Sequence, residues 1–164
     1  MKLDRRNNLL PYGKLSAGLF LALGLLLIWQ SRRSPVGDFA NYYYASRLLV
    51  EGQFSGEAYD PYTFNQMASR RSPELVFANY TPVPPVSVPA YLPFALIGDA
   101  GLAKAAFNLL GLLLFCLAYC RLLRRLKPDG HWWLLFAPLA CLGPLLNNFH
   151  QGQSYLLLLA FLME

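Results

Sequence analysis

Long uncharged stretches alternate with short basic segments along this chain. Residues 15–31 carry no charge, and a helix of that length spans about 25 Å, close to the thickness of a bilayer core. A second, largely apolar run covers residues 100–122, and from His131 the chain has no Lys, Arg, Asp or Glu before Glu164. The pattern predicts membrane-spanning helices at 15–31, 100–122 and 131–147, and the start of a further one at 154–164.

Composition supports a membrane protein and excludes several other classes. Of the 164 residues, 55% are hydrophobic and only 14% are charged, about half the charged share of a soluble domain. This excludes a disordered chain, a disulfide framework and an ordinary cytosolic enzyme. The basic residues that give the net charge of +5 cluster beside the apolar runs. This placement is typical of the charges that orient a membrane protein, and it does not indicate a nucleic-acid partner. Cys116 and Cys120 could share a helix face, but their apolar surroundings are typical of buried thiols, so we predict no metal site and no cofactor.

The basic clusters predict how the chain crosses the membrane. Residues 75–98 are long enough to cross, but their five prolines disfavour a lipid-exposed helix. If the whole region 32–98 is an external loop, the basic clusters around Lys14 and Arg124 both face the cytoplasm, as the positive-inside rule favours. We therefore expect a plasma or inner membrane protein with a cytoplasmic N-terminus. Because the last apolar run is too short to cross, we also expect the front part of a larger multi-span protein, with little activity alone.

The external loop opens with a predicted amphipathic helix over residues 39–51. Asp38 can cap its start, Gly52 can end it, and the apolar residues Phe39, Leu49 and Val50 fall broadly on one side with the tyrosines. Such an aromatic helix suits the headgroup level of a membrane. Asp38 then lies at the mouth of the helix bundle. It either only caps the helix or takes part in the chemistry of the site.

A polar cluster interrupts the apolar C-terminal region. Asn147, Asn148, His150, Gln151 and Gln153 lie in a short segment where polar side chains are costly unless they line a cavity or bond to one another. In the favoured topology this cluster shares a membrane side with Asp38. A sugar-binding role and a simple polar connector between helices both stay open.

Four segments in order resemble a known family. They are GDFANYYYASRLLVEG (37–52), AYDP (58–61), YTPVPP (80–85) and NNFHQGQSYLLLL (147–159). Over about 35–159 the chain resembles the N-terminal part of glycosyltransferase family 87. The resemblance implies an all-α integral membrane protein of the GT-C type, a helical bundle whose long external loop carries interfacial helices. It also implies transfer of a hexose, typically mannose, from a polyprenyl phosphate to a lipid or glycan acceptor.

The resemblance assigns roles to particular residues. The acidic residue at the start of the first external loop is the family's proposed catalytic base, and Asp38 matches it. A carboxylate can take the acceptor proton, and arginine suits the departing phosphate. Asp60 precedes a proline and is interpreted as a turn starter. The residues expected to bind substrate are Tyr42, Tyr43, Arg70, Arg71, Tyr80, Asn147, His150, Gln151 and Gln153.

Two alternatives stay open beside this assignment. The adjacent arginines Arg70 and Arg71 could simply form a solvated surface. The whole chain could also be a non-catalytic multi-span protein, such as a transport or assembly subunit whose aromatic loop binds lipid or a partner.

Overall fold

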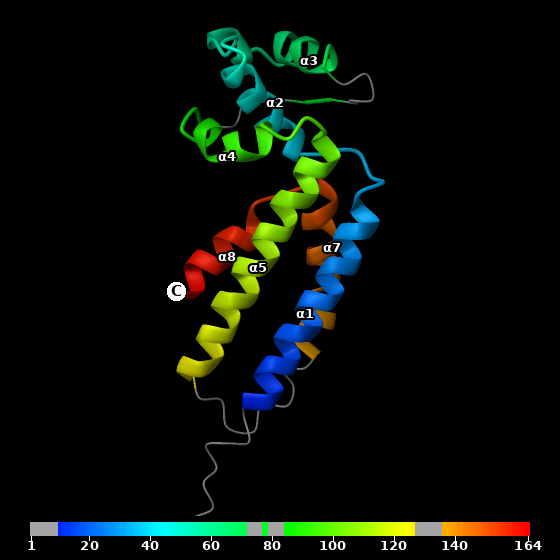
Figure 1. Cartoon of the computed structure of the whole chain (residues 1–164), viewed down its shortest axis with the longest axis vertical. Coiled ribbons are helices and arrows are strands. Elements are labelled where there is room, and N and C mark those ends of the chain that lie inside the picture. Colours follow the sequence, from blue (N-terminus) through cyan, green and yellow to red (C-terminus); the bar gives the residue numbers. More distant parts are fainter. Residues whose placement is uncertain (1–9, 72–76, 79–83, 127–135) are drawn as a thin grey trace, which may run out of the picture.

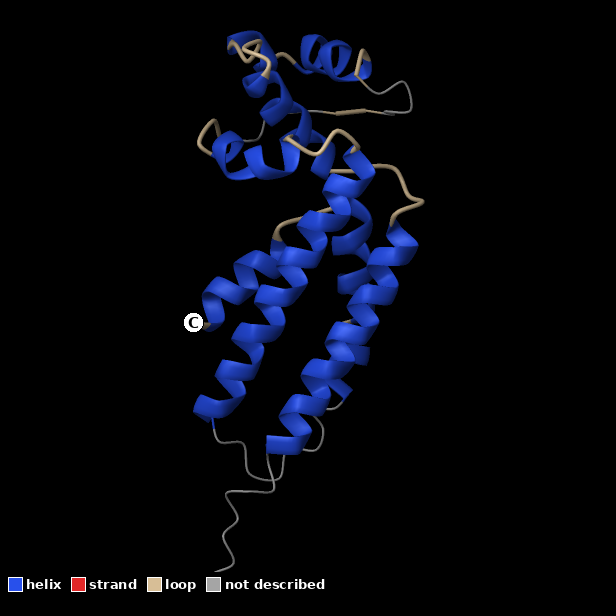
Figure 2. Ribbon diagram, viewed as in Figure 1, coloured by secondary structure: helices blue, strands red, loops and turns tan. Residues whose placement is uncertain are grey.

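The computed structural model describes residues 10–71, 77–78, 84–126 and 136–164, and within these ranges it contains helices and no strand (Figure 2). We call α1 and α5–α8 the bundle, and α2–α4 with the short helix η2 the head layer, which covers one end of the bundle (Figure 1). The expectation of an all-helical protein is confirmed for the described residues. In chain order the helices are α1 (Leu10–Ser31), α2 (Phe39–Val50), η2 (Gly56–Tyr59), α3 (Pro61–Ser69), α4 (Ser87–Ala95), α5 (Ala100–Leu126), α6 (Ala137–Ala140), α7 (Leu142–Gln151) and α8 (Tyr155–Met163).

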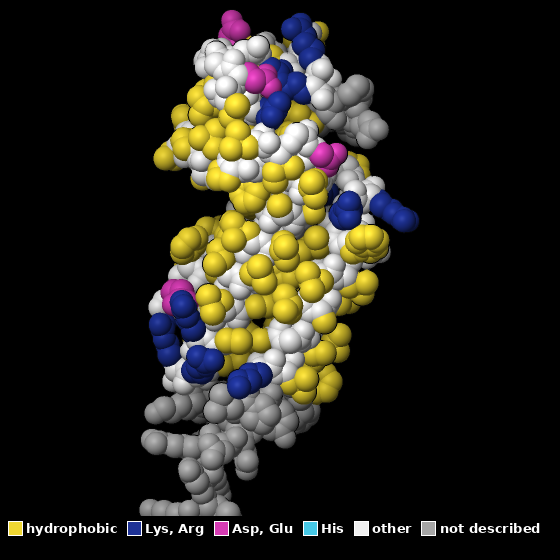
Figure 3. Space-filling view, in the orientation of Figure 1, with side chains coloured by type: hydrophobic (Ala, Val, Ile, Leu, Met, Phe, Trp, Pro, Cys, Tyr) yellow, Lys and Arg dark blue, Asp and Glu magenta, His cyan; other side chains and the backbone are white. Residues whose placement is uncertain are grey.

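Two helices of the bundle are long and apolar enough to cross a membrane. They are α1, over Gly13–Ser31, and α5, over Ala100–Arg125. The two helices pack closely, because a Cβ added to Gly24 of α1 would come within 2.6 Å of the Leu112 side chain of α5. Both extend further than the predicted 15–31 and 100–122. Many of their leucines point outward, so the bundle presents an apolar surface (Figure 3).

The third predicted span differs from the single helix expected over 131–147. Residues 131–135 lie outside the described part, and the chain then forms α6 and α7 with a break at Cys141. Pro144 accounts for the break, because it has no N–H to donate to the carbonyl of Ala140 and is favoured only near a helix start. Helix α7 continues to Gln151, which carries the polar cluster to the end of the bundle beside the head layer (Figure 1).

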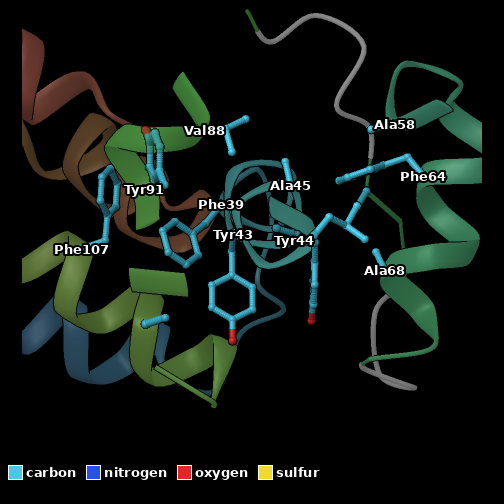
Figure 4. Packing of buried hydrophobic residues seen from close by; sticks show 14 residues of the cluster. Phe39, Tyr43, Tyr44, Ala45, Ala58, Phe64, Ala68, Val88, Tyr91 and Phe107 are labelled. Atoms are coloured by element: carbon cyan, nitrogen blue, oxygen red, sulfur yellow. The ribbon is translucent and has the colours of Figure 1, made fainter. Parts of the chain in front are cut away.

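The head layer is held together by an aromatic core around α2 (Figure 4). Phe39, Tyr43 and Tyr44 are buried, and the Ser46 hydroxyl donates to the carbonyl oxygen of Val88 over 2.8 Å, which ties α2 to α4. The buried face differs from the one expected for an amphipathic helix, because α2 packs against both α4 and α5. Leu49 and Val50, expected on the same apolar side as Phe39, are exposed, whereas Leu48 is buried.

Helix α4 lies across the end of the bundle and does not run along it (Figure 1). Its nine residues span about 14 Å, roughly half the thickness of a bilayer core. As a result α5 starts at the end of the bundle where α1 stops. The basic residues Lys14, Arg121, Arg124 and Arg125 gather at the opposite end (Figure 3). Which of the two ends faces the cytoplasm stays a prediction from charge.

Candidate functional site

The side chain of Asp38 turns away from the helix that it precedes. It occupies the N-cap position of α2 but makes no side-chain capping bond. Instead the Nε2 of Gln153 donates to its Oδ2 over 2.7 Å, although the two residues lie far apart in sequence. The carboxylate is solvent-exposed and takes part in no ion pair of the described residues. An acid from the first loop and an amide from the polar cluster therefore meet at one site.

A left-handed glycine aims Gln153 at this position. Helix α7 ends at Gly152, whose φ of 66° and ψ of 44° suit glycine far better than other residues. A Cβ at Gly152 would lie only 2.6 Å from the Cβ of Phe39, the residue after Asp38. Gly37, immediately before Asp38, also has a positive φ of 64°, and a Cβ there would lie 2.9 Å from the Cα of Gln151. The two turns therefore pack directly against each other.

Two stacked tyrosines lie beside the carboxylate. The rings of Tyr42 and Tyr91 are 4.5 Å apart and nearly parallel, at 9°. Burial, followed by the negative charge of Asp38 and then by Tyr155, raises the pKa of Tyr42. Burial and, to a smaller extent, Tyr42 raise the pKa of Tyr91 to about 12, against the opposing effect of its side-chain hydrogen bond with Ser154. Both phenols therefore keep their protons at neutral pH and can donate hydrogen bonds.

Several buried polar atoms on neighbouring segments lack a protein partner. Among the described residues, Asn148 Oδ1, His150 Nε2, Gln153 Oε1 and Asn108 Oδ1 make no hydrogen bond. Buried polar atoms nearly always find a partner, so these atoms are positions for water or for the hydroxyl groups of a ligand. Three of these four atoms belong to the polar cluster, so the cluster contains buried polar atoms as well as exposed side chains. Asn147, in contrast, is exposed.

The remaining predicted residues lie in different surroundings. Tyr43 is buried and donates to the carbonyl oxygen of Ile97 over 2.7 Å, and Gln151 packs against Gly37. Arg71, at the end of α3, pairs with Glu51, its Nε lying 2.9 Å from Oε2, whereas Arg70 is exposed and makes no ion pair among the described residues.

Two further predictions concern residues outside the Asp38 site. Tyr80 lies outside the described residues. The interpretation of Asp60 as a turn starter is confirmed, because its Oδ2 accepts a bond of 2.7 Å from the backbone N–H of Thr63 and caps α3.

Sequence reasoning missed Tyr91, Asn108 and Lys104. Tyr91 follows a proline-rich stretch, where the pattern showed no helix face. Lys104 is a charged residue near the start of a spanning helix and is 1% exposed, which is itself a signal, since buried charges in such helices are rare. No group of three or more His, Cys, Asp or Glu side chains in the described part of the chain could hold a metal ion.

Comparison with known families decides the class of the protein. The model of glycosyltransferase family 87 matches residues 80–163, just over half of the chain. The chain belongs to glycosyltransferase family 87. Family 87 is a family of membrane glycosyltransferases, and the two helices that are long and apolar enough to cross a membrane agree with this class. The matched segment contains Tyr91, His150 and Gln153, whereas Asp38 lies before it. No curated protein and no solved structure matches the chain.

Proposed function

We propose that this family 87 chain transfers a hexose, expected to be mannose, from a polyprenyl phosphate to a lipid or glycan acceptor, with Asp38 as general base. The observation that carries the proposal is the 2.7 Å hydrogen bond between Gln153 Nε2 and Asp38 Oδ2. It joins the acidic side chain at the start of α2 to the polar cluster of the bundle. In this proposal the bundle is of the GT-C type and the site faces the outside.

The proposed reaction needs one proton acceptor and one leaving group. The acceptor hydroxyl oxygen attacks the anomeric carbon, and Asp38 takes the hydroxyl proton as that bond forms. The bond between the anomeric carbon and the phosphate oxygen breaks, and the polyprenyl phosphate leaves with the electron pair. Attack opposite the leaving group inverts the anomeric configuration. The Gln153 amide orients the carboxylate while leaving its second oxygen for the acceptor.

A lipid-carried donor suits the position of Asp38. The polyprenyl chain stays in the bilayer beside the apolar surface of α1 and α5, so its phosphate arrives where these helices leave the membrane. Asp38 lies a few residues beyond the end of α1 at Ser31. Of the two arginines predicted to bind phosphate, Arg71 is engaged by Glu51, whereas Arg70 is exposed and makes no ion pair among the described residues.

The sugar itself requires hydrogen-bond partners next to the carboxylate. The phenols of Tyr42 and Tyr91 supply donors, Gln153 Oε1 supplies an unpartnered acceptor, and His150 Nε2 is an unpartnered ring nitrogen. Hexose hydroxyls both donate and accept, so they can complete this set. Tyr43, Asn147 and Gln151 stay predicted substrate-binding residues, as does Tyr80, which lies outside the described residues. We propose no metal or cofactor.

The decisive variant is Asp38→Asn, compared with Asp60→Asn. Asparagine can keep the contact with Gln153 but cannot act as a base, so transfer should fall by about 10²–10⁴-fold. Asp60 caps α3, and asparagine caps nearly as well, so its variant should keep its activity. We would measure transfer of radiolabelled mannose from polyprenyl phosphate to total membrane lipids, using membranes that contain the full gene product.

Two outcomes would contradict the proposal separately. Retained turnover by Asp38→Asn, at normal levels of membrane insertion, removes Asp38 from the mechanism. Transfer from a nucleotide sugar, with none from polyprenyl-phosphate sugars, rejects the lipid-linked donor while leaving Asp38 as a candidate base.

A further inference from the structure

A lysine is buried where the bundle meets the head layer. Lys104 of α5 is 1% exposed, and it takes part in none of the ion pairs of the described residues. A buried ammonium group is costly unless its protons are all bonded. Its Nζ makes a longer contact of 3.5 Å with the carbonyl oxygen of Ser34. The three closer acceptors are Ser34 Oγ at 3.0 Å, the carbonyl oxygen of Pro35 at 2.8 Å and that of His150 at 3.2 Å. These acceptors match the three protons of the ammonium.

The acceptors belong to the two turns that carry the proposed site. Pro35 lies three residues before Asp38, and His150 lies three residues before Gln153. Lys104 therefore connects the linker between α1 and α2 with the end of α7. Because its protons are used by the protein itself, Lys104 has none left for a substrate.

The stem of Lys104 also fills the space beneath the turn. A Cβ at Gly152 would lie 3.1 Å from Lys104 Cγ, so the aliphatic chain packs directly below this left-handed glycine. Four residues further along α5, Asn108 Nδ2 donates to the carbonyl oxygen of Phe149 over 2.9 Å. One face of α5 thus holds the last turn of α7 at two points.

We propose that Lys104 is a positioning residue that holds Asp38 beside Gln153. Its ammonium binds a carbonyl group on each side of the pair, and so it sets the distance between the two turns. Without the charge, three part-buried bonds to Ser34, Pro35 and His150 are lost, and the turns separate enough to loosen the 2.7 Å bond between Gln153 and Asp38. The catalytic consequence rests on the proposed role of Asp38, whereas the structural consequence does not.

The test measures the geometry without using activity. Asp38→Cys and Gln153→Cys are introduced into the full gene product after Cys116, Cys120 and Cys141 have been replaced by serine, and the rate of oxidative cross-linking is followed in membranes. Lys104→Met keeps the volume of the side chain but removes its donors, and it should slow cross-linking about tenfold, as expected for loss of a charged hydrogen bond. Lys104→Arg keeps a cation and should restore most of the rate. Lys14→Met, at an exposed lysine, is the matched control and should change nothing.

Activity then separates this proposal from the proposed function. In the otherwise native protein, Lys104→Met should lower kcat about tenfold with little change in KM, because the base is displaced and the substrate contacts stay. Unchanged cross-linking in Lys104→Met overturns the positioning role, whatever Asp38→Asn does. Slower cross-linking in Lys104→Met, together with an active Asp38→Asn variant, supports the positioning role of Lys104 and rejects Asp38 as the base.

A milder variant covers the case in which Lys104→Met fails to fold. Ser34→Ala removes the hydroxyl acceptor and leaves the carbonyl groups of Ser34, Pro35 and His150 in place. We expect it to slow cross-linking about threefold, in keeping with a single weaker hydrogen bond. A rate equal to that of the parent protein would then overturn the proposal.

Discussion

The head layer and the bundle are both helical and each has a buried apolar core, but the bundle leaves many more of its large apolar side chains exposed. In the head layer Phe39 and Phe64 are fully buried, at 0% exposure. In the bundle Leu26 is 61% exposed and Trp29 65% exposed, at the end of α1. The head layer is therefore stabilised by contacts within the protein, whereas the outer surface of the bundle relies on lipid. The proposed site lies at the boundary between the two regions.

The largest effect should come from removing a ring from the head-layer core. Phe39 packs against Tyr43, Tyr91, Phe94 and Phe107, with ring centroids 5.3–6.4 Å away. Phe39→Ala should lower the free energy of unfolding by about 3–5 kcal/mol, because the lost contacts leave a cavity. Chemical denaturation in detergent micelles measures this change.

The matched control lies on the bundle. Trp29→Ala removes a larger ring that points outward, so it should change stability in micelles by less than about 1 kcal/mol. Equal losses in the two variants would show that the bundle surface is buried in the native protein, and the contrast between the regions would fail.

The next effect concerns the boundary itself. Gly152→Ala forces a side chain into a backbone of positive φ and into contact with Phe39, so we expect a loss of about 2–4 kcal/mol. Gly143, in the first turn of α7, has no atom within 4 Å of an added Cβ, so Gly143→Ala should be neutral or slightly stabilising. Thermal unfolding of both variants checks this, and similar melting temperatures would mean that the two turns are not closely packed.

A smaller effect is expected within the head layer. Ser46→Ala removes the buried donor to the Val88 carbonyl and should cost about 1–3 kcal/mol, because that acceptor stays buried. Ser87 makes a comparable bond to the Pro84 carbonyl at an exposed position, so Ser87→Ala should cost less than about 1 kcal/mol. The same denaturation assay compares them. The reverse order would indicate that α2 and α4 are joined less tightly than their contact suggests.

The smallest effect should depend on pH. The side-chain hydrogen bond from Arg71 is the main cause that lowers the pKa of Glu51 below its ordinary value. Because the pKa of Glu51 is lower in the folded state, its ionised carboxylate stabilises the folded state at pH values above its ordinary pKa of 4.5. This contribution disappears as the pH falls through the folded-state pKa. Glu51→Gln should therefore cost less than about 1 kcal/mol at pH 7, since the pair is partly exposed, and nothing at pH 2. Denaturation at both pH values tests this, and a difference that persists at pH 2 would exclude a charge effect.

The positions of α1, α2, α5 and α8 follow well from the sequence, because apolar runs and helix signals are local, whereas α3 and α4 were not located by it. The helix predicted over 39–51 occurs at Phe39–Val50, and the apolar run 154–164 forms α8 over Tyr155–Met163. The buried face of α2 could not be predicted in the same way. It depends on α4 and α5, which approach from two directions, and periodicity within one helix describes only a single buried side.

The candidate site was predictable only in part. The acid and the polar cluster stand out as unusual residues beside apolar segments, and topology places them at one end of the bundle. That Gln153, rather than its neighbours, reaches Asp38 depends on the left-handed turn at Gly152. From the sequence, Arg71 is as good a candidate for binding phosphate as Arg70. In the structure, however, its guanidinium donates to Glu51, which lies twenty residues earlier.

The sequence by itself determines that this chain is helical, that it belongs in a membrane and that clusters of basic residues flank its apolar runs, because each of these properties depends on composition along a short segment. Only the tertiary structure decides which polar groups meet. Lys104 shows this most clearly, because its acceptors come from residues about seventy positions before it and about forty-six positions after it. Hydrogen bonds require a distance of about 3 Å, and that distance is set by how the helices pack.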